Sequence, residues 1–492
     1  MAPVTSDEDE PPQRLREPQR PRGPQESREP PELRGLRGQG PRGLRGVARG
    51  GVAGVAGAGV GAGAQFLLAV VVTRAAEVET AGAFFTTAAL ALMIAGVAKL
   101  DAGGGVVYFV ARARTCGYQG ASGYIRAGLV PGVCVAVIAG VVFHPQLGAA
   151  SFALPMMVAA DILLAATRGL GGMRPTVLLD GVLLPVGQLI LVAAVVFTPA
   201  WHLVLTPAPA SMTAPVPAPV SASVFVTSPG WLVGAWVAPY LPLLVLSALS
   251  LRGRVPRTPP LPGAARELWR HTAPRSAAGA IQAVFQRLDI VIVGALGGLA
   301  QAAVYTAATR FKVVGQLANQ GLAQTAQPRL IRAMAEGDLV KARTLYQATT
   351  IWLVVMTWPV WLAYAAVAPW LLTVFGSPYG SAVPIALVLS ATMMLATACG
   401  MVDVVLTSAG HTTASLLNLV AALAVTVLLD LALIPTHGAL GAALGWSGGV
   451  IVKNLLPLWQ IHHRYGLRPF GRHSLTALRP SRWTPPHHQE VR

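Results

Sequence analysis

The sequence predicts an all-α integral membrane protein with about twelve transmembrane helices, and three observations support this fold class. Of the 492 residues, 53% are hydrophobic and only 12% are charged, whereas about 25% are charged in an average soluble domain. The mean hydropathy is +0.56. Long apolar runs recur along the chain, and the loops between them alternate between basic and neutral. Lipid is the solvent that this composition favours, because one soluble core could not bury so much apolar surface.

Each apolar run has about the 20 residues that a helix needs to cross a bilayer. The runs lie near 48–73, 82–104, 122–143, 150–169, 176–197, 230–250, 276–297, 302–323, 346–368, 381–403, 412–433 and 438–460.

The charges of the loops predict the orientation, because arginine and lysine gather in cytoplasmic loops. Six arginines lie within residues 251–275, whereas residues 199–228 contain no charged residue. The loops near Gly298, Gly376 and His437 are also neutral, and basic loops separate most of these neutral ones. We therefore expect both termini in the cytoplasm. The net charge of +17 follows from this topology, and nucleic acid is not an expected partner.

A basic segment divides the spans six and six, which predicts two six-helix lobes around a central cavity. A short repeat agrees: residues 81–89 read AGAFFTTAA and residues 301–309 read QAAVYTAAT. Paired halves of equal span number are a common transporter design. Gly57 and Gly61 in the first span have the spacing of close helix contacts, within the chain or with a second copy. The predicted parts are a disordered cytoplasmic tail (1–46), an N-terminal lobe (47–250), a basic cytoplasmic linker (251–275), a C-terminal lobe (276–460) and a cytoplasmic tail (461–492).

A polar stripe marks the eighth predicted span. Its residues recur at spacings of four and three, which places them on one face of a continuous helix. We expect this face to line a wet cavity, the alternative being polar groups of a neighbouring helix. The stripe consists of Tyr305, Thr309, Lys312, Gln316 and Asn319.

Charged residues lie deep in the seventh and eighth spans, where an unpaired charge costs at least about 2.5–3.5 kcal/mol. Arg310 is two residues from Lys312 and points about 200° away from it. We expect Arg310 to face Asp289, since both lie at similar depth in adjacent spans. The pair is either a structural ion pair or a cation that holds a diphosphate and is tuned by Asp289. Arg287 is a weaker candidate for the same cationic role.

In the first half, Asp161 lies near the midplane of its span and is a candidate for coupling transport to a proton or sodium ion. It could equally be a buried carboxyl that stays neutral. Snorkelling or capping accounts for the other charges, which lie nearer span ends: Lys99, Asp101, Asp180, Asp403 and Asp430. No P-loop, Ser-His-Asp or HExxH pattern occurs, and we expect neither enzymatic activity nor a cofactor or metal site.

The second half resembles the polysaccharide flippases of the MATE-like superfamily, the Wzx-type exporters. RLDIVIVG followed by AAVYTAATRF is similar to the family's seventh and eighth spans, and LALIPTHGALGAALGW to its junction of the eleventh and twelfth. RGLGGMRP after the fourth span resembles the family's Arg-Gly loop. The chain departs from the family in its charged N-terminal tail and in its Pro-rich outer loop at 206–219.

The resemblance implies a twelve-helix, two-lobed fold with a central cationic cavity. It implies an undecaprenyl-diphosphate-linked oligosaccharide as substrate, flipped across the bacterial plasma membrane for surface polysaccharide synthesis. Membrane lipids are further partners, with glycosyltransferases or a polymerase of the same pathway as candidates. Three rival functions stay open: a lipid II flippase, a multidrug or cation antiporter of the same superfamily, and a membrane-embedded glycan ligase or polymerase.

Overall fold

The computed structural model describes residues 41–115, 120–197, 228–255, 263–471 and 474. The predicted tail up to residue 40, the outer loop at 206–219 and most of the C-terminal tail lie outside the described residues. The chain divides into two units, residues 1–52 and residues 53–492. The described part of the first unit is the beginning of one helix, and all other elements belong to the second unit.

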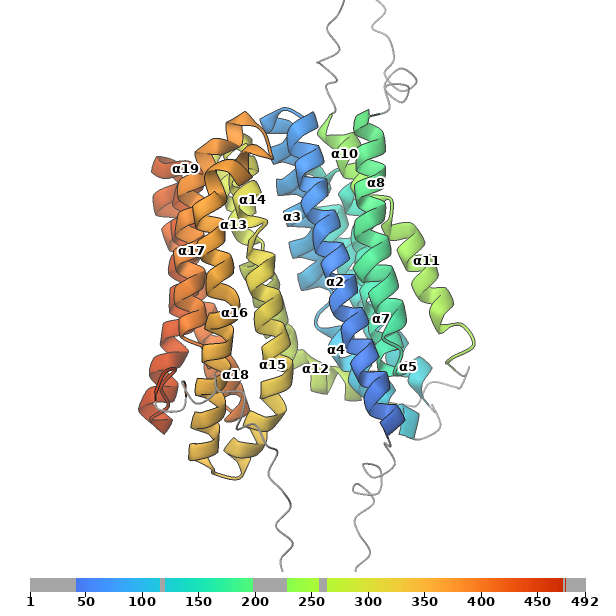
Figure 1. Cartoon of the computed structure of the whole chain (residues 1–492). Helices are drawn as coiled ribbons and strands as arrows, with labels where there is room; N and C mark the ends of the chain where they lie inside the picture. The colour runs from blue at the N-terminus through green and yellow to red at the C-terminus, as the bar shows by residue number, and fades with distance from the viewer. Residues whose placement is uncertain (1–40, 116–119, 198–227, 256–262, 472–473, 475–492) are drawn as a thin grey trace, which may run out of the picture. The chain divides into compact units, whose positions relative to one another are not determined.

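The described residues of the first half form helices, named here in chain order as in Figure 1. They are α2 Pro41–Ala75, α3 Val78–Ala98, α4 Ala102–Thr115, α5 Ala121–Val142, α6 His144–Leu147, α7 Ala150–Gly169, η1 Thr176–Leu183, α8 Leu184–Phe197, α10 Pro229–Val237 and α11 Tyr240–Leu251. Because α2 begins at Pro41, it includes residues 41–46 at the end of the predicted tail.

The second half is also helical in its described residues. Its elements are α12 Ala264–Phe285, α13 Leu288–Ile292, η2 Val293–Gly297, α14 Leu299–Thr309, α15 Lys312–Ala335, α16 Leu339–Thr373, η3 Ser377–Ala382, α17 Val383–Ala398, α18 Val402–Ser408 and α19 Thr412–Tyr465. Helix α12 starts inside the predicted linker 251–275, so the C-terminal part of that linker is helical.

The multi-pass membrane architecture is confirmed by the length and apolarity of the helices. Within the described residues, nine helices are long and apolar enough to cross a membrane. A tenth candidate combines residues 275–285 and 288–297, which are bent by 49°. Helix α19 covers two predicted spans, 412–433 and 438–460, and breaks at Gly438, where φ is 55° and ψ is −131°. The count of twelve and the cytoplasmic termini stay predictions.

Each half packs mainly on itself. In the first half α7 contacts α4, α5 and α11, and in the second half α16 contacts α15 and α17. Figure 1 shows the blue-to-green helices on one side and the orange-to-red helices on the other. Helices α3 and α14 form the most extensive contact between the halves. These two helices contain the repeated segments 81–89 and 301–309, so the repeat places its two copies against one another.

Small residues allow the closest helix approaches. A Cβ atom at Gly57 would lie 2.6 Å from Val177 Cγ1, and one at Gly61 would lie 2.6 Å from Gly181 O. The contact predicted from the spacing of Gly57 and Gly61 is therefore internal, between α2 and η1. Neither glycine could carry a larger side chain without moving these helices apart.

Candidate functional site

The predicted carboxylate at the start of the seventh span is buried. Asp289 of α13 is 2% exposed. Its Oδ2 accepts a hydrogen bond from Tyr305 Oη at 2.6 Å, and its Oδ1 accepts one from the Ile290 backbone N–H at 2.9 Å. Tyr305 is 0% exposed. Tyr305 thus joins α14 to α13, as in the alternative in which polar groups of a neighbouring helix bind the polar stripe.

The polar stripe spans two helix segments. Helix α14 ends at Thr309 and α15 begins at Lys312, and the two residues between them, Arg310 and Phe311, keep helical φ and ψ angles. Thr309 is buried, and its hydroxyl donates to the Thr306 carbonyl at 3.0 Å. Tyr305 and Thr309 both lie on α14, where a spacing of four residues keeps them on the same side of the helix. The side chains of Lys312, Gln316 and Asn319 lie outside the described residues.

Arg310 contacts the other half of the chain. Its guanidinium carbon lies 5.0 Å from the centre of the Phe85 ring on α3, a cation–π contact. Its Nε is buried and has no hydrogen-bond partner among the described residues. Arg310 thus contacts the first half, and its pairing with Asp289 stays a prediction.

Arg287 lies at the bend between α12 and α13. Its backbone, with φ at −133° and ψ at −18°, departs from helical geometry. The side chain is half-buried. The structure thus places two arginines at helix ends of the second half, Arg287 before α13 and Arg310 after α14.

In the first half, Asp161 of α7 forms an ion pair with Lys99. The distance from Lys99 Nζ to Asp161 Oδ2 is 3.3 Å, and the two side chains are 42% and 40% exposed. Lys99 caps the end of α3, and the next two residues, Leu100 and Asp101, both have φ at 50°. Lys99 thus stands at the end of α3, and its ammonium group pairs with the Asp161 carboxylate of α7.

Asp430 is a buried carboxylate that sequence reasoning assigned to snorkelling or capping, and that assignment was wrong. It is 0% exposed within α19. A Cβ atom at Gly445 would lie 2.0 Å from its Oδ1, so the glycine makes room for the carboxylate. Two acids, Asp289 and Asp430, are thus buried in the second half.

The two halves are joined at the end that the loop charges predict to be outside. Arg74, at the end of α2, donates from Nε to the Val374 carbonyl and from Nη2 to the Thr373 carbonyl, both at 2.7 Å. A Cβ atom at Gly82 would lie 1.8 Å from Leu299 O, so α3 and α14 meet backbone to backbone. We call these contacts of Arg74 and Gly82 the outer latch.

An aromatic cluster continues the outer latch into the membrane. The rings of Phe66 and Phe311 lie 5.5 Å apart, as do those of Phe66 and Phe375. Phe66 belongs to α2, Phe311 lies at the break between α14 and α15, and Phe375 follows α16. The outer ends of α2, α3, α14 and α16 are therefore closed against one another.

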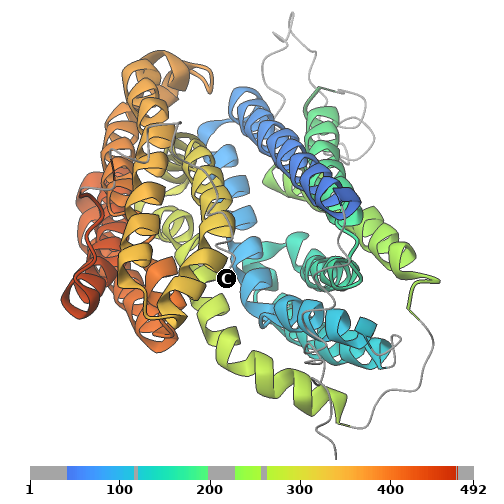
Figure 2. The same ribbon diagram turned by 60° about the horizontal axis from the view of Figure 1, so that its bottom comes forward.

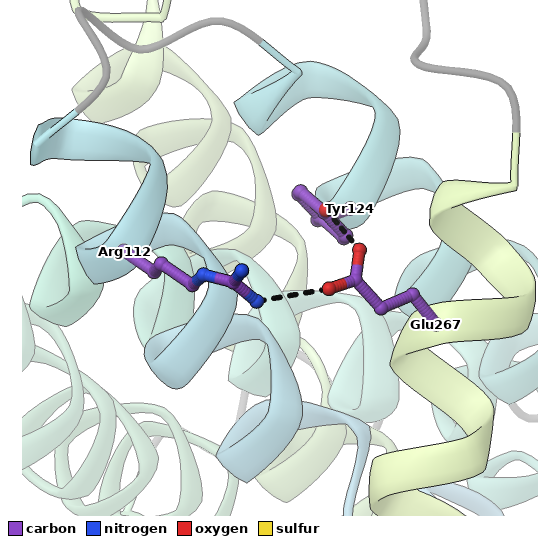
Figure 3. Close-up of polar contacts among 3 residues, drawn as sticks. All are labelled: Arg112, Tyr124 and Glu267. Carbon is purple, nitrogen blue, oxygen red and sulfur yellow. Dashed lines mark hydrogen bonds and ion pairs between the residues drawn. The ribbon is translucent and has the colours of Figure 1, made fainter.

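At the opposite end, helix α12 is fastened to the first half, as Figure 3 shows. Glu267 Oε1 lies 2.9 Å from Arg112 Nη1 of α4, and Glu267 Oε2 accepts a hydrogen bond from Tyr124 Oη of α5 at 2.6 Å. Arg275 Nε lies 3.1 Å from Asp101 Oδ2 at the α3–α4 break. In Figure 2, α12 leaves the second half and runs along this end of the first-half helices.

Helix α12 also touches the second half, which makes it a link between the two. Lys453 Nζ of α19 lies 3.4 Å from Gln282 Oε1 and 5.1 Å from the centre of the Phe285 ring. The 49° bend follows directly after these contacts. Within the described residues no group of three or more His, Cys, Asp or Glu side chains could hold a metal ion.

The chain is similar to known proteins in sequence over one segment. Residues 208–384 match the model of a family described as polysaccharide biosynthesis proteins. No curated protein matches the chain.

Solved structures match over most of the chain. One is an inward-facing conformation of a multidrug resistance MATE family transporter of the MOP superfamily, with TM-score 0.64, 16% identity, and coverage of 82% of this chain and 94% of that one. An outward-facing conformation of such a transporter gives TM-score 0.56, 15% identity, and coverage of 85% and 95%. A MOP superfamily transporter from Pyrococcus furiosus, described with a binding pocket of reverse polarity, gives TM-score 0.53, 16% identity, and coverage of 85% and 95%.

These solved structures are membrane transporters and not enzymes, and they confirm both the predicted fold class and the resemblance to the MATE-like superfamily. The chain is a multi-pass membrane protein with the fold of the MATE-like transporters of the MOP superfamily.

Proposed function

We propose that this chain is a transporter that flips a lipid-linked oligosaccharide, carried on undecaprenyl diphosphate, from the inner to the outer leaflet of a bacterial plasma membrane. The observation that carries the proposal is the match of residues 208–384 to a family of polysaccharide biosynthesis proteins, on a MATE-like transporter fold. The transporter class rests on both comparisons. The lipid-linked substrate and the plasma membrane are proposed in addition to this class.

The arginines near the contact between the halves favour an anionic substrate. Arg310 reaches across to Phe85 of α3, and its Nε is buried without a hydrogen-bond partner among the described residues. A guanidinium with free donors can bind a diphosphate oxygen, and in a low-dielectric site this attraction is stronger than in water. Arg287 is the second candidate ligand, and Lys312, Gln316 and Asn319 are further candidates in the same segment of the chain.

Alternating access supplies the movement. The outer latch closes one end of the two halves, and the chain superposes better on the inward-facing than on the outward-facing transporter, with TM-scores of 0.64 and 0.56. The proposal therefore assigns this conformation to the substrate-loading state. Opening the outer end requires that Arg74 leave the end of α16 and that α3 separate from α14.

Flipping by the purified full-length chain in vesicles tests the substrate. The probe is a short polyprenyl-diphosphate sugar with a fluorescent label, and a quencher is added outside the vesicles. Label in the inner leaflet is protected from the quencher, so the rate at which this protected fluorescence is lost measures flipping. Arg310→Gln should slow flipping about 10-fold or more, since one hydrogen bond to a charged group contributes about 1.5–3 kcal/mol. Arg343→Gln is the matched control, because Arg343 donates to the Gly466 carbonyl within the second half. Equal rates for the two variants would contradict the assignment.

Lys312 offers an internal comparison for the same assay. If Lys312→Ala abolishes flipping in a folded protein while Arg310→Ala lowers only the amount of folded protein, Lys312 holds the diphosphate and Arg310 is structural. The reverse pattern assigns the diphosphate to Arg310. Replacing Asp289 and Arg310 together by neutral residues shows whether a loss of export follows from a loss of folding.

A multidrug antiporter is the second candidate, because two of the matched structures are multidrug resistance transporters. A cationic drug would use acids such as the buried Asp289 and Asp430. Saturable efflux of ethidium that is lost in Asp289→Asn, together with absence of flipping, would favour this function over the first. Reporter fusions at residues 215 and 262 test the orientation that both functions share, and 215 should lie outside.

A further inference from the structure

A groove lies at the end of the first half that the loop charges predict to be cytoplasmic. Its volume is about 460 Å³, and its walls come from the turn after α7, from η1 and from the end of α11. Arg174 and Arg254 both line it, together with the Gly171–Gly172 turn. No Asp or Glu is among the described residues that line it. The groove is therefore an open hollow with positive charge.

The glycine turn brings guanidinium groups close to the groove. Arg254 Nη1 lies 3.5 Å from the position that a Cβ atom would take at Gly172. Arg114 Nη1 lies 2.5 Å from the corresponding position at Gly171, where φ is 82°. A side chain at either glycine would meet an arginine. The two glycines thus keep space open beside cationic groups that could bind an anion in common.

The membrane side of the groove is apolar. Leu178 of η1 is 60% exposed and Leu246 of α11 is 38% exposed. Both leucines belong to candidate membrane spans, residues 176–197 and 229–251. Exposed leucines in a membrane span contact acyl chains, so a ligand with an anionic head and an apolar tail matches both walls.

The groove is remote from the contact between the halves. Helix α11 packs on α7 and η1, which are helices of the first half. In Figures 1 and 2, α11 lies at the edge of the helices opposite α17 and α19. A lipid can therefore reach the groove laterally from the inner leaflet without entering the region where α3 meets α14.

We propose that this groove binds an anionic glycerophospholipid of the inner leaflet, with the phosphate between Arg174 and Arg254 and an acyl chain along Leu178 and Leu246. The site is separate from the transported substrate, and it would hold the α7–η1 turn and the end of α11 together. Charge complementarity and the apolar wall favour a lipid over a free phosphate.

Native mass spectrometry of the full-length chain tests the proposal, with dioleoyl phosphatidylglycerol and dioleoyl phosphatidylcholine as probes. The wild-type chain should bind the anionic lipid preferentially. Arg174→Gln combined with Arg254→Gln should weaken this binding about 10- to 30-fold, as expected for two cations at an anionic lipid. Arg266→Gln combined with Arg270→Gln is the control. Both of its arginines are exposed on α12, so it removes equal charge away from the groove.

Gly172→Leu is a second variant, which fills the groove without a change of charge. This variant should also bind the anionic lipid more weakly. It tests lipid binding in the groove if the arginine variant does not fold. Equal weakening by the groove and control pairs would overturn the proposal in favour of diffuse surface charge. Displacement of the lipid by inorganic phosphate alone would overturn the role of the apolar wall. If farnesyl diphosphate binds more tightly than the anionic lipid, and the groove variant loses this binding, the groove would be a substrate site instead.

Discussion

Removing the guanidinium of Arg74 should open the outer end of the protein. Its two hydrogen bonds, each 2.7 Å long, reach the last carbonyls of α16 from a position 299 and 300 residues earlier in the chain. These carbonyls carry the negative end of the helix dipole, which a cation stabilises. A hydrogen bond to a charged group contributes about 1.5–3 kcal/mol, and exposure to solvent lowers this value. We therefore expect Arg74→Ala to destabilise the closed outer end by about 1–3 kcal/mol, a shift of about 5- to 150-fold in the ratio of closed to open molecules.

Distances between spin labels measure this shift. Labels at Glu79 and Ser381, both exposed, report on the outer end from the two halves. They are introduced after the three native cysteines are replaced by serine. Arg74→Ala should add a longer distance to the distribution, and Arg74→Lys should lie between the variant and the wild type. Arg343→Ala is the matched control, because its hydrogen bond lies within the second half. An unchanged distribution in Arg74→Ala, with intact folding, would refute the latch.

Three further predictions follow from other contacts. Gly82→Ala should destabilise the protein by about 1–3 kcal/mol, because its Cβ atom would lie 1.8 Å from Leu299 O; an unchanged melting temperature would contradict this close approach. Glu267→Gln should cost less than about 1 kcal/mol and reduce the sensitivity of the melting temperature to salt, because the Arg112–Glu267 pair is 62% and 45% exposed; a larger loss would mean that the pair does more than hold α12. Asp161→Asn should weaken the dependence of transport on a proton or sodium gradient, and unchanged ion dependence would leave Asp161 with only its ion pair to Lys99.

The membrane-spanning fold follows from properties that are local in the sequence. A helix in lipid must satisfy its own backbone and present apolar side chains, so each span is recognisable from about 20 neighbouring residues. The spacing of Gly57 and Gly61 likewise indicated a close helix contact of the first span, and only the structure shows that η1 is its partner. The repeat of residues 81–89 and 301–309 indicated two related halves. It did not indicate that its copies touch, because a repeat carries no information on the angle between its halves.

The tertiary structure alone decided which polar groups meet. Helical periodicity does not show which neighbouring helix a polar side chain meets, and in the structure Tyr305 meets Asp289 while Arg310 meets Phe85. Depth was counted from predicted span ends, but burial depends on neighbouring helices, as Gly445 makes room for the fully buried Asp430. Composition and periodicity thus determined that lipid surrounds the chain and that its spans are helices. The pairing of charges depended on helix breaks and on contacts between residues far apart in the chain, and these exist only in the folded protein.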